Sequence, residues 1–241
     1  MTEAQNNHYC NQMQLILFDI DGTLVDSGGA GVRALQKAFE EVLLIENAFC
    51  NISMAGKTDL QIIKEGLSRH GLQSDNGLVP RITGSYIRHL STEINSGDKR
   101  LKPGIVEVLE ALVERNNRYQ LGLLTGNLEQ GARIKLGVFG LNGYFPTGAF
   151  GSDHEDRNKL LPIAVERFRI ISGRDVDFSD CVIIGDTPRD VMCAKPYNAL
   201  CVAVATGPYS AGSLVKAGAD VVIEDLSDTD HFLNILHCLE R

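Results

Sequence analysis

The sequence predicts an α/β fold in which a doubly wound parallel sheet carries an inserted helical segment. Three observations support this prediction. Short, nearly continuous apolar runs recur along the 241-residue chain, as expected for strands that are buried on both faces. Helical patterns separate these runs, and such alternation is typical of parallel sheets covered by helices. Residues 26–100 interrupt the alternation and contain helical patterns alone.

The apolar runs give the expected strands in chain order. They are residues 14–19 (QLILFD), 120–125 (QLGLLT), 181–186 (CVIIGD), 200–205 (LCVAVA) and the shorter 220–223 (DVVI). Helices are expected at residues 103–115, 128–137, 159–170, 188–195 and 229–239. Strands and helices together predict a Rossmann-like core built from residues 1–25 and 101–241.

The inserted segment, residues 26–100, predicts an all-helical domain. Val32, Leu35, Phe39 and Val42 fall on one helical face, which predicts an amphipathic helix just after the first strand. Residues 58–69 and 79–94 continue the helical pattern and are separated by the polar, glycine-rich stretch 71–77.

Composition narrows the function classes. Lys plus Arg number 23 and Asp plus Glu number 31, and the resulting net charge of −8 argues against a nucleic-acid-binding surface, which needs a basic stripe. The first twelve residues lack the apolar stretch of a signal peptide, and no apolar run reaches the roughly 20 residues of a membrane helix. The six cysteines show no metal-site spacing. We therefore expect a cytoplasmic protein without a membrane partner, either a monomer or a small homo-oligomer.

The first strand ends in two acids, Asp19 and Asp21, followed by Gly22. Residues two apart on a strand point to the same side, so both carboxylates should project together. Neighbouring acids repel each other unless a cation lies between them or one acid stays protonated. The alternative is a plain surface turn that ends the strand.

Two later strands also end in polar residues. Thr125 is followed by Gly126 and Asn127 at the start of a helix, which offers a hydroxyl and free N–H groups to a phosphate. An ordinary helix cap by Asn127 is the alternative. Asp186 ends another strand, and Asp190 lies one turn into the helix that follows, where capping is again an alternative.

The placement of these residues in the predicted sheet favours a functional site. The carboxyl ends of parallel strands lie on one edge, and ligands bind there, so Asp19, Asp21, Thr125 and Asp186 should converge. Acids gathered around an anionic substrate require a cation, and magnesium takes oxygen ligands. Arg157 and Lys159 precede a helix between the second and third of these strands, and either could add a fixed positive charge or lie solvated at the surface.

Four segments resemble, in order, the motifs of the haloacid dehalogenase superfamily: LILFDIDGTLVDS, LLTGN, a basic residue before a helix, and VIIGDTPRD. The tail, VAVATGPYS…LVKAGADVVIEDLSD, resembles the phosphoglycolate-phosphatase-like branch, in which the segment 26–100 would be a helical cap domain. The resemblance implies an Mg²⁺-dependent phosphatase that acts on a small phosphorylated metabolite. Phosphoglycolate is suggested as substrate by the resemblance alone.

The resemblance also implies roles for individual residues. Asp19 would be the nucleophile that forms an aspartyl-phosphate, and Asp21 the general acid and then the general base. Thr125, with the N–H groups of Gly126 and Asn127, would bind phosphoryl oxygens. The magnesium ligands would be Asp19, Asp186 and the backbone carbonyl of Asp21, with Asp190 supporting them.

The third motif departs from the Lys-Pro pair of many relatives, because this chain has Arg157-Asn158-Lys159. We favour Arg157 as the cation, since it precedes the helical pattern. Lys57 lies in a segment, 54–59, that resembles the cap loop which touches the substrate, although Thr58 could simply cap a helix there.

Three other functions share parts of this pattern. A phosphomutase of the beta-phosphoglucomutase type has the same core motifs and would require a sugar bisphosphate. A non-catalytic phosphoacceptor or binding protein would gather similar acids but would lack the helical insertion. A scaffold protein that has lost activity would not need the complete set of acids. An acid at Asp21 argues against dehalogenation, because a halide leaving group needs no proton.

Overall fold

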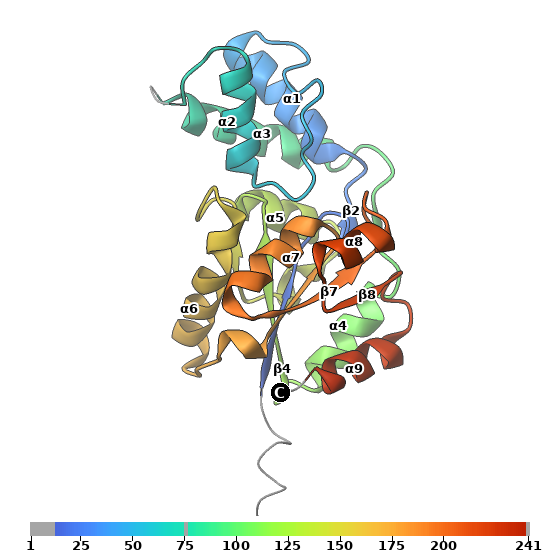
Figure 1. Cartoon of the computed structure of the whole chain (residues 1–241). Coiled ribbons are helices and arrows are strands. Elements are labelled where there is room, and N and C mark those ends of the chain that lie inside the picture. The colour runs from blue at the N-terminus through green and yellow to red at the C-terminus, as the bar shows by residue number, and fades with distance from the viewer. Residues whose placement is uncertain (1–12, 75–76, 240–241) are drawn as a thin grey trace, which may run out of the picture.

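The computed structural model of the chain describes residues 13–74 and 77–239, in which a six-stranded parallel sheet lies below a group of helices (Figure 1). The strand order is β5-β4-β1-β6-β7-β8. The strands are β1 (Gln14–Phe18), β4 (Tyr119–Thr125), β5 (Thr147–Phe150), β6 (Cys181–Gly185), β7 (Leu200–Val204) and β8 (Val221–Ile223). The predicted doubly wound parallel sheet is confirmed, and β1 lies where the order switches from one side to the other.

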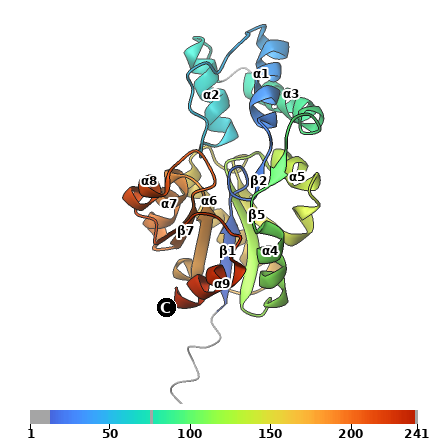
Figure 2. The same cartoon turned by 90° about the vertical axis from the view of Figure 1, so that its right-hand side faces the viewer.

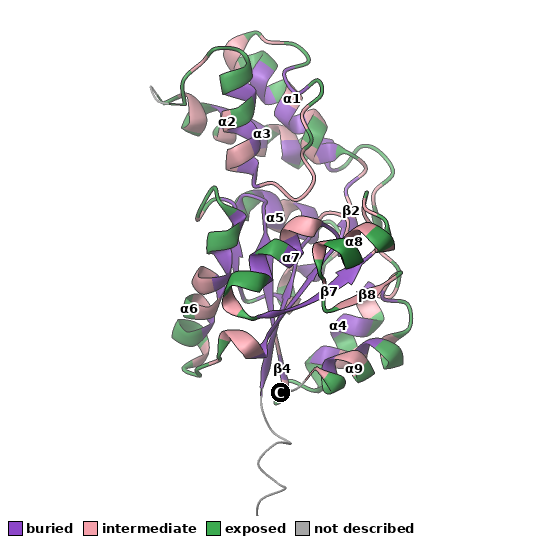
Figure 3. Cartoon of the chain, in the orientation of Figure 1, coloured by how far each residue is buried: buried purple, intermediate pink, exposed green. Residues whose placement is uncertain are grey.

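Both faces of the sheet are buried, which explains the unbroken apolar runs. On β1, Ile16 and Phe18 pack into one apolar cluster, whereas Leu15 and Leu17 pack into another on the opposite face. The first cluster is covered by α4 (Ile105–Glu114), α5 (Glu129–Gly137) and α9 (Thr229–Cys238). The second is covered by α6 (Leu160–Ser172) and α7 (Pro188–Ala194), with α8 (Ala211–Ala217) beside α7. Figure 3 shows the buried strands between helices whose outer faces are exposed.

Three helices lie over the carboxyl ends of the strands (Figures 1 and 2). They are α1 (Ala30–Leu43), α2 (Asp59–Arg69) and α3 (Leu78–Glu93), which we call the helical unit (residues 30–93). The unit has its own apolar cluster, in which Phe39, Ile63 and Tyr86 are fully buried. The domain boundaries given above, residues 26–100 inserted between 1–25 and 101–241, stay a prediction.

The chain enters and leaves the helical unit through a two-stranded ribbon. β2 (Val25–Asp26) and β3 (Arg100–Leu101) pair antiparallel, Val25 with Leu101 and Asp26 with Arg100. This ribbon, β5 and α8 were not predicted. The ribbon strands and β5 have too few residues to show a hydrophobic period, and tertiary pairing defines them. The helix α8 has local signals that the sequence analysis did not use, the N-cap Ser210 and the C-cap Gly218. The remaining short helices are η1 (Leu141–Tyr144), η2 (Arg157–Lys159), η3 (Phe178–Asp180) and η4 (Lys195–Tyr197).

The structure bears on the expected absence of a membrane helix but not on the expected absence of a signal peptide. Within residues 13–74 and 77–239, every helix is too short or too polar to cross a membrane. The expectation concerning a signal peptide falls on residues 1–12, which lie outside the described residues together with Cys10. The other five cysteines are free thiols, and Cys181, Cys193 and Cys201 are buried.

Candidate active site

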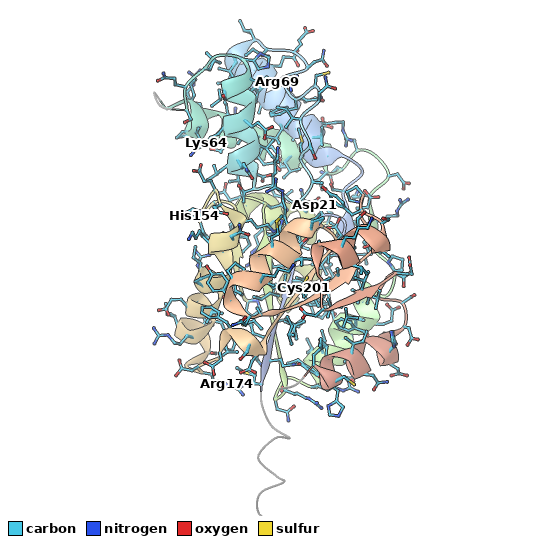
Figure 4. The ribbon with its side chains drawn as sticks, in the orientation of Figure 1. Asp21, Lys64, Arg69, His154, Arg174 and Cys201 are labelled. Carbon is cyan, nitrogen blue, oxygen red and sulfur yellow. The ribbon has the colours of Figure 1, made fainter. Side chains whose placement is uncertain are left out.

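The ends of three adjacent strands bring the predicted residues together. Asp19 follows β1, Thr125 ends β4 and Asp186 follows β6, and β1 lies between the other two strands. Asp19, Asp21 and Asp186 line a pocket of about 260 Å³ that the helical unit covers from above. Asp21 is labelled at this junction in Figure 4. The convergence follows from the parallel sheet, because all strand ends of one kind share an edge.

Asp19 is held between a cation and a hydroxyl at the base of this pocket. Its carboxylate is 4% exposed, and its Oδ1 lies 3.2 Å from Nη2 of Arg157. Burial raises the pKa of Asp19 to about 6, against the lowering effects of Arg157 and a hydrogen bond from Thr125. The positive charge of Arg157 therefore offsets part of the cost of a buried carboxylate.

Arg157, and not Lys159, reaches the strand ends. The guanidinium of Arg157 is buried, donates to the carboxylate of Asp190 and to the backbone oxygen of Gly56 at 3.2 Å, and lies beside Asp19. Its Nε is buried without a hydrogen-bond partner among the described residues. Lys159 is exposed two residues further along η2, so the structure does not bring this predicted residue to the pocket.

Asp190 belongs to the start of α7. Its Oδ2 accepts from the backbone N–H of Thr187 at 3.0 Å and from the Thr187 hydroxyl at 2.8 Å, and Oδ1 accepts from Arg157. A Cβ on Gly185 would lie 2.1 Å from Cγ of Asp190, so only glycine leaves room for this carboxylate. Asp190 therefore completes the capping box with the N-cap Thr187 and holds Arg157 beside Asp19.

Three of the acids fit a metal ion. Asp19, Asp186 and Asp190 each offer an oxygen within 4.8 Å of the others. Burial, followed by the charges of Asp19 and Asp190, raises the pKa of Asp186 to about 8, against the lowering effect of Arg157. Glycines leave the space around Asp186 open: a Cβ at Gly22 or Gly207 would lie 2.3 or 1.6 Å from its Oδ2.

Hard divalent cations prefer such oxygen ligands. Asp190 accepts hydrogen bonds on both oxygens, from Arg157 and from Thr187, which suits a supporting role beside Asp19 and Asp186. The carboxylate of Asp21 is not part of this group, and the role of its backbone carbonyl as a ligand stays a prediction.

Asp21 is held by a lysine that the sequence analysis missed. Nζ of Lys135 lies 2.5 Å from Oδ2 of Asp21 and 2.6 Å from Oδ1 of Asn127. Burial raises the pKa of Asp21, but Lys135, Asn127 and Ser27 together leave it below its usual value. Lys135 is only 4% exposed, and it follows the buried Ala132 by three residues on α5. A lysine on the apolar side of a predicted helix was the available signal.

Asn127 does not cap α5, contrary to the alternative considered from sequence. Its side chain donates to Asp21 and to Oγ1 of Thr125, both at 2.9 Å, so it connects the ends of β1 and β4. The cap residue is Leu128, and its N–H donates at 2.8 Å to Asp59 of the helical unit. The start of α5 is therefore completed by a residue distant in sequence.

Comparisons with known proteins agree with this geometry. The sequence profile of a family described as haloacid dehalogenase-like hydrolase matches residues 16–204, which include β1, the helical unit and β7. The chain belongs to this family.

Alignments with individual relatives cover most of this haloacid dehalogenase-like hydrolase. A phosphoglycolate phosphatase from Agrobacterium fabrum is 26% identical over 214 residues, 88% of this chain and 89% of the relative. The crystal structure of a hydrolase from Pseudomonas syringae has a TM-score of 0.69 at 25% identity and covers 93% of this chain and 99% of its own. A putative beta-phosphoglucomutase from Bacteroides vulgatus shares the fold, with a TM-score of 0.68 at 18% identity. The match covers 96% of this chain and 91% of the other.

In this family member, a loop of the helical unit rests on the strand ends. Lys57 lines the pocket, and its ammonium pairs with Glu65 on α2. Thr58 caps α2 by accepting from Gln61, and its hydroxyl also donates to the backbone oxygen of Glu155 at 2.7 Å. The loop therefore combines the two interpretations that the sequence left open: a helix cap and a lining of the pocket.

Gly126 permits the close approach of this loop. A Cβ at position 126 would lie 2.2 Å from the backbone oxygen of Lys57, so Gly126→Ala must push the loop away. Because misplacing a lid by about 1 Å can cost about 10²-fold, we expect kcat/KM for an aryl phosphate to fall by roughly that factor. Gly212→Ala, where nothing lies within 4 Å of the added carbon, is the matched control and should keep full activity. Equal activities for the two variants would contradict the close contact.

Asp59 carries a buried charge at the interface between the helical unit and the core. It is 7% exposed, and burial raises its pKa to about 6 from 3.8. Because the pKa is higher in the folded chain, this group stabilises the fold at low pH, and the contribution is lost as the pH rises through about 6.

Asp59→Asn should therefore stabilise the protein more strongly in alkaline solution. We expect its gain in unfolding free energy, relative to the original chain, to be about 1 kcal/mol larger at about pH 8 than at about pH 5. Urea unfolding of both proteins in the presence of a chelator measures this difference. A gain that does not change with pH would show that Asp59 does not titrate in this range.

Proposed function

We propose that this chain is a magnesium-dependent phosphatase that hydrolyses a small-molecule phosphate monoester through an aspartyl-phosphate on Asp19. The observation that carries the proposal is the buried carboxylate of Asp19, held 3.2 Å from Arg157 beside the acids Asp186 and Asp190. Similarity to curated phosphoglycolate phosphatases supports phosphate chemistry and makes phosphoglycolate a substrate to test.

The first step would transfer the phosphoryl group to the enzyme. A carboxylate oxygen of Asp19 attacks phosphorus while the bond to the alcohol oxygen breaks, and Asp21 gives that oxygen its proton. Arg157 and the hydroxyl of Thr125 would orient Asp19 and the phosphoryl oxygens. Phosphoryl transfer depends mainly on such positioning and on neutralising the charge of those oxygens.

The second step would return the enzyme to its starting state. Asp21 takes a proton from water, the water oxygen attacks phosphorus, and the bond to Asp19 breaks to release phosphate. Once Asp21 has given its proton to the alcohol oxygen, Lys135 and Asn127 stabilise the ionised carboxylate that remains, and this form accepts the proton from water. Asp19, Asp186 and the backbone carbonyl of Asp21 would hold Mg²⁺, positioned by Asp190, and the ion would neutralise phosphoryl charge when bound.

Residues 26–100 would act as a cap domain over the core formed by residues 1–25 and 101–241. A lid over the strand ends excludes bulk water and selects the alcohol, and Lys57 would lie at the substrate side of it. We propose a small phosphorylated metabolite as the partner. The cytoplasmic location stays a prediction that the free thiols support.

Hydrolysis of p-nitrophenyl phosphate after removal of metals, with and without added magnesium, tests the proposal. We expect turnover only when magnesium is present. A requirement for a sugar bisphosphate, with the phosphoryl group returned to the sugar, would instead indicate a phosphomutase. A phosphorylated Asp19 that persists without turnover would indicate a non-catalytic phosphoacceptor.

A further inference from the structure

The pocket has two chemically different halves. The core supplies the half that holds Asp19, Asp21, Asp186 and the cations Arg157 and Lys135. The helical unit supplies the other half, the roof, which is lined by the apolar side chains Val32, Leu35, Met54 and Ile62, the ring of Tyr86 and the charged residues Lys57 and Asp59. A phosphoryl group on Asp19 lies at the core half, so the alcohol part of the substrate must extend under this roof.

Every cation that lines the pocket, within the described residues, is already paired. Arg157 contacts Asp19 and Asp190, and Lys135 contacts Asp21, so both serve the core half. The ammonium of Lys57 pairs with Glu65, which does not line the pocket. The roof therefore offers no uncommitted positive charge to the alcohol part of a substrate.

Besides the paired Lys57, the roof holds the carboxylate of Asp59, which has the wrong sign to bind an anion. Asp59 is nearly buried, with its Oδ2 accepting from Leu128 at 2.8 Å, and the fully buried Tyr86 lies against it. A carboxylate or second phosphate on the substrate would lose water and meet a carboxylate and apolar side chains. Buried charges without partners are strongly disfavoured, whereas an apolar or hydroxyl-bearing carbon chain suits these surroundings.

We propose that the roof selects phosphate monoesters of small, uncharged alcohols and rejects substrates that carry a second anionic group. This inference rests on the phosphatase function proposed above and identifies its substrate class. The relatives are named phosphoglycolate phosphatases, and phosphoglycolate carries a carboxylate. The inference therefore predicts a different substrate for the present chain.

Three esters of similar size test the selection: phosphoglycolate, the phosphate ester of glycolamide, and propyl phosphate. The first two differ in the charge of one end group. We expect kcat/KM to be at least about tenfold higher for the two neutral esters, since a tenfold ratio needs only about 1.4 kcal/mol. A value for phosphoglycolate equal to or above that of the glycolamide ester would overturn the inference.

A charge placed in the roof gives a second test. Met54→Lys adds a cation of similar shape, and Met54→Gln is the matched uncharged control. We expect Met54→Lys to raise the ratio of phosphoglycolate to glycolamide ester by about tenfold, and Met54→Gln to leave it unchanged. An unchanged ratio in both variants would show that charge in the roof does not select the substrate.

These outcomes are distinct from a failure of the proposed function. If the folded protein with magnesium hydrolyses neither p-nitrophenyl phosphate nor any of the three esters, the phosphatase proposal is wrong and this inference is lost with it. Turnover of p-nitrophenyl phosphate together with a preference for phosphoglycolate would overturn the inference alone.

Discussion

Asp19→Asn should abolish phosphatase activity. We expect kcat for p-nitrophenyl phosphate to fall by about 10⁴-fold or more, as for the loss of other catalytic nucleophiles, with a much smaller change in KM. The amide is nearly the same size as the carboxylate and can keep the contact with Thr125, but its oxygen is a far weaker nucleophile. Steady-state kinetics, combined with phosphoenzyme trapping by rapid acid quench and mass spectrometry, measures both parts of the claim.

Asp175→Asn is the matched control. Asp175 is an exposed acid in the loop before β6, at the edge of the sheet opposite to the pocket, and its substitution should leave kcat unchanged. A phosphorylated peptide that contains residue 19 should appear in the original chain and be absent from Asp19→Asn. Substantial turnover by a folded Asp19→Asn protein would mean that another group attacks the phosphorus.

Arg157→Met should damage both activity and stability. Removing the guanidinium leaves Asp19 and Asp190 buried beside each other without their shared cation. Breaking a buried pair in this way costs about 3 kcal/mol or more of unfolding free energy. The loss of a positive group at the phosphoryl site should lower kcat by about 10³-fold. Urea unfolding and aryl phosphate hydrolysis measure the two effects.

Two further substitutions separate position from charge. Lys159→Met removes an exposed cation two residues away and should change neither stability nor kcat measurably. Arg157→Lys keeps the charge but loses the planar fork that reaches Asp19, Asp190 and the backbone of Gly56 together, so only part of the activity should return. A larger loss in Lys159→Met than in Arg157→Met would mean that the cation has been assigned to the wrong residue.

The strands that position the site could be predicted because their environment leaves a simple pattern in the sequence. β1, β4, β6 and β7 are covered on both faces, so nearly every residue in them is apolar, and the runs of β1, β4 and β6 end at a polar residue. The rule that parallel strands share their carboxyl edge then placed Asp19, Thr125 and Asp186 together without knowledge of the strand order.

The contacts that support the site residues join positions far apart in the sequence, so they could not be predicted from it. Lys135 and Asp21 are 114 positions apart, and Asp59 completes the start of α5 from 69 positions away. The contact of Lys135 with Asp21 forms inside the core when α5 packs beside the end of β1, and the contact of Asp59 with α5 forms when the helical unit packs on the core. The sequence favoured Arg157 over Lys159 only by its position before the helical pattern, whereas its contacts with Asp19 and Asp190 depend on the packing of strands distant in sequence.

The ribbon of β2 and β3 affects how this chain can be rearranged. Opposed residues on antiparallel strands have Cα atoms about 5 Å apart, so the chain leaves the core at Asp26 and returns at Arg100 almost where it left. A short hairpin turn can bridge such a gap, so we expect the segment between these residues to be replaceable as a module. Exchanging this module with that of a relative would transfer the roof and leave Asp19, Thr125 and Asp186 in place. We expect substrate preference to change with the exchanged module and phosphoryl chemistry to stay with the core.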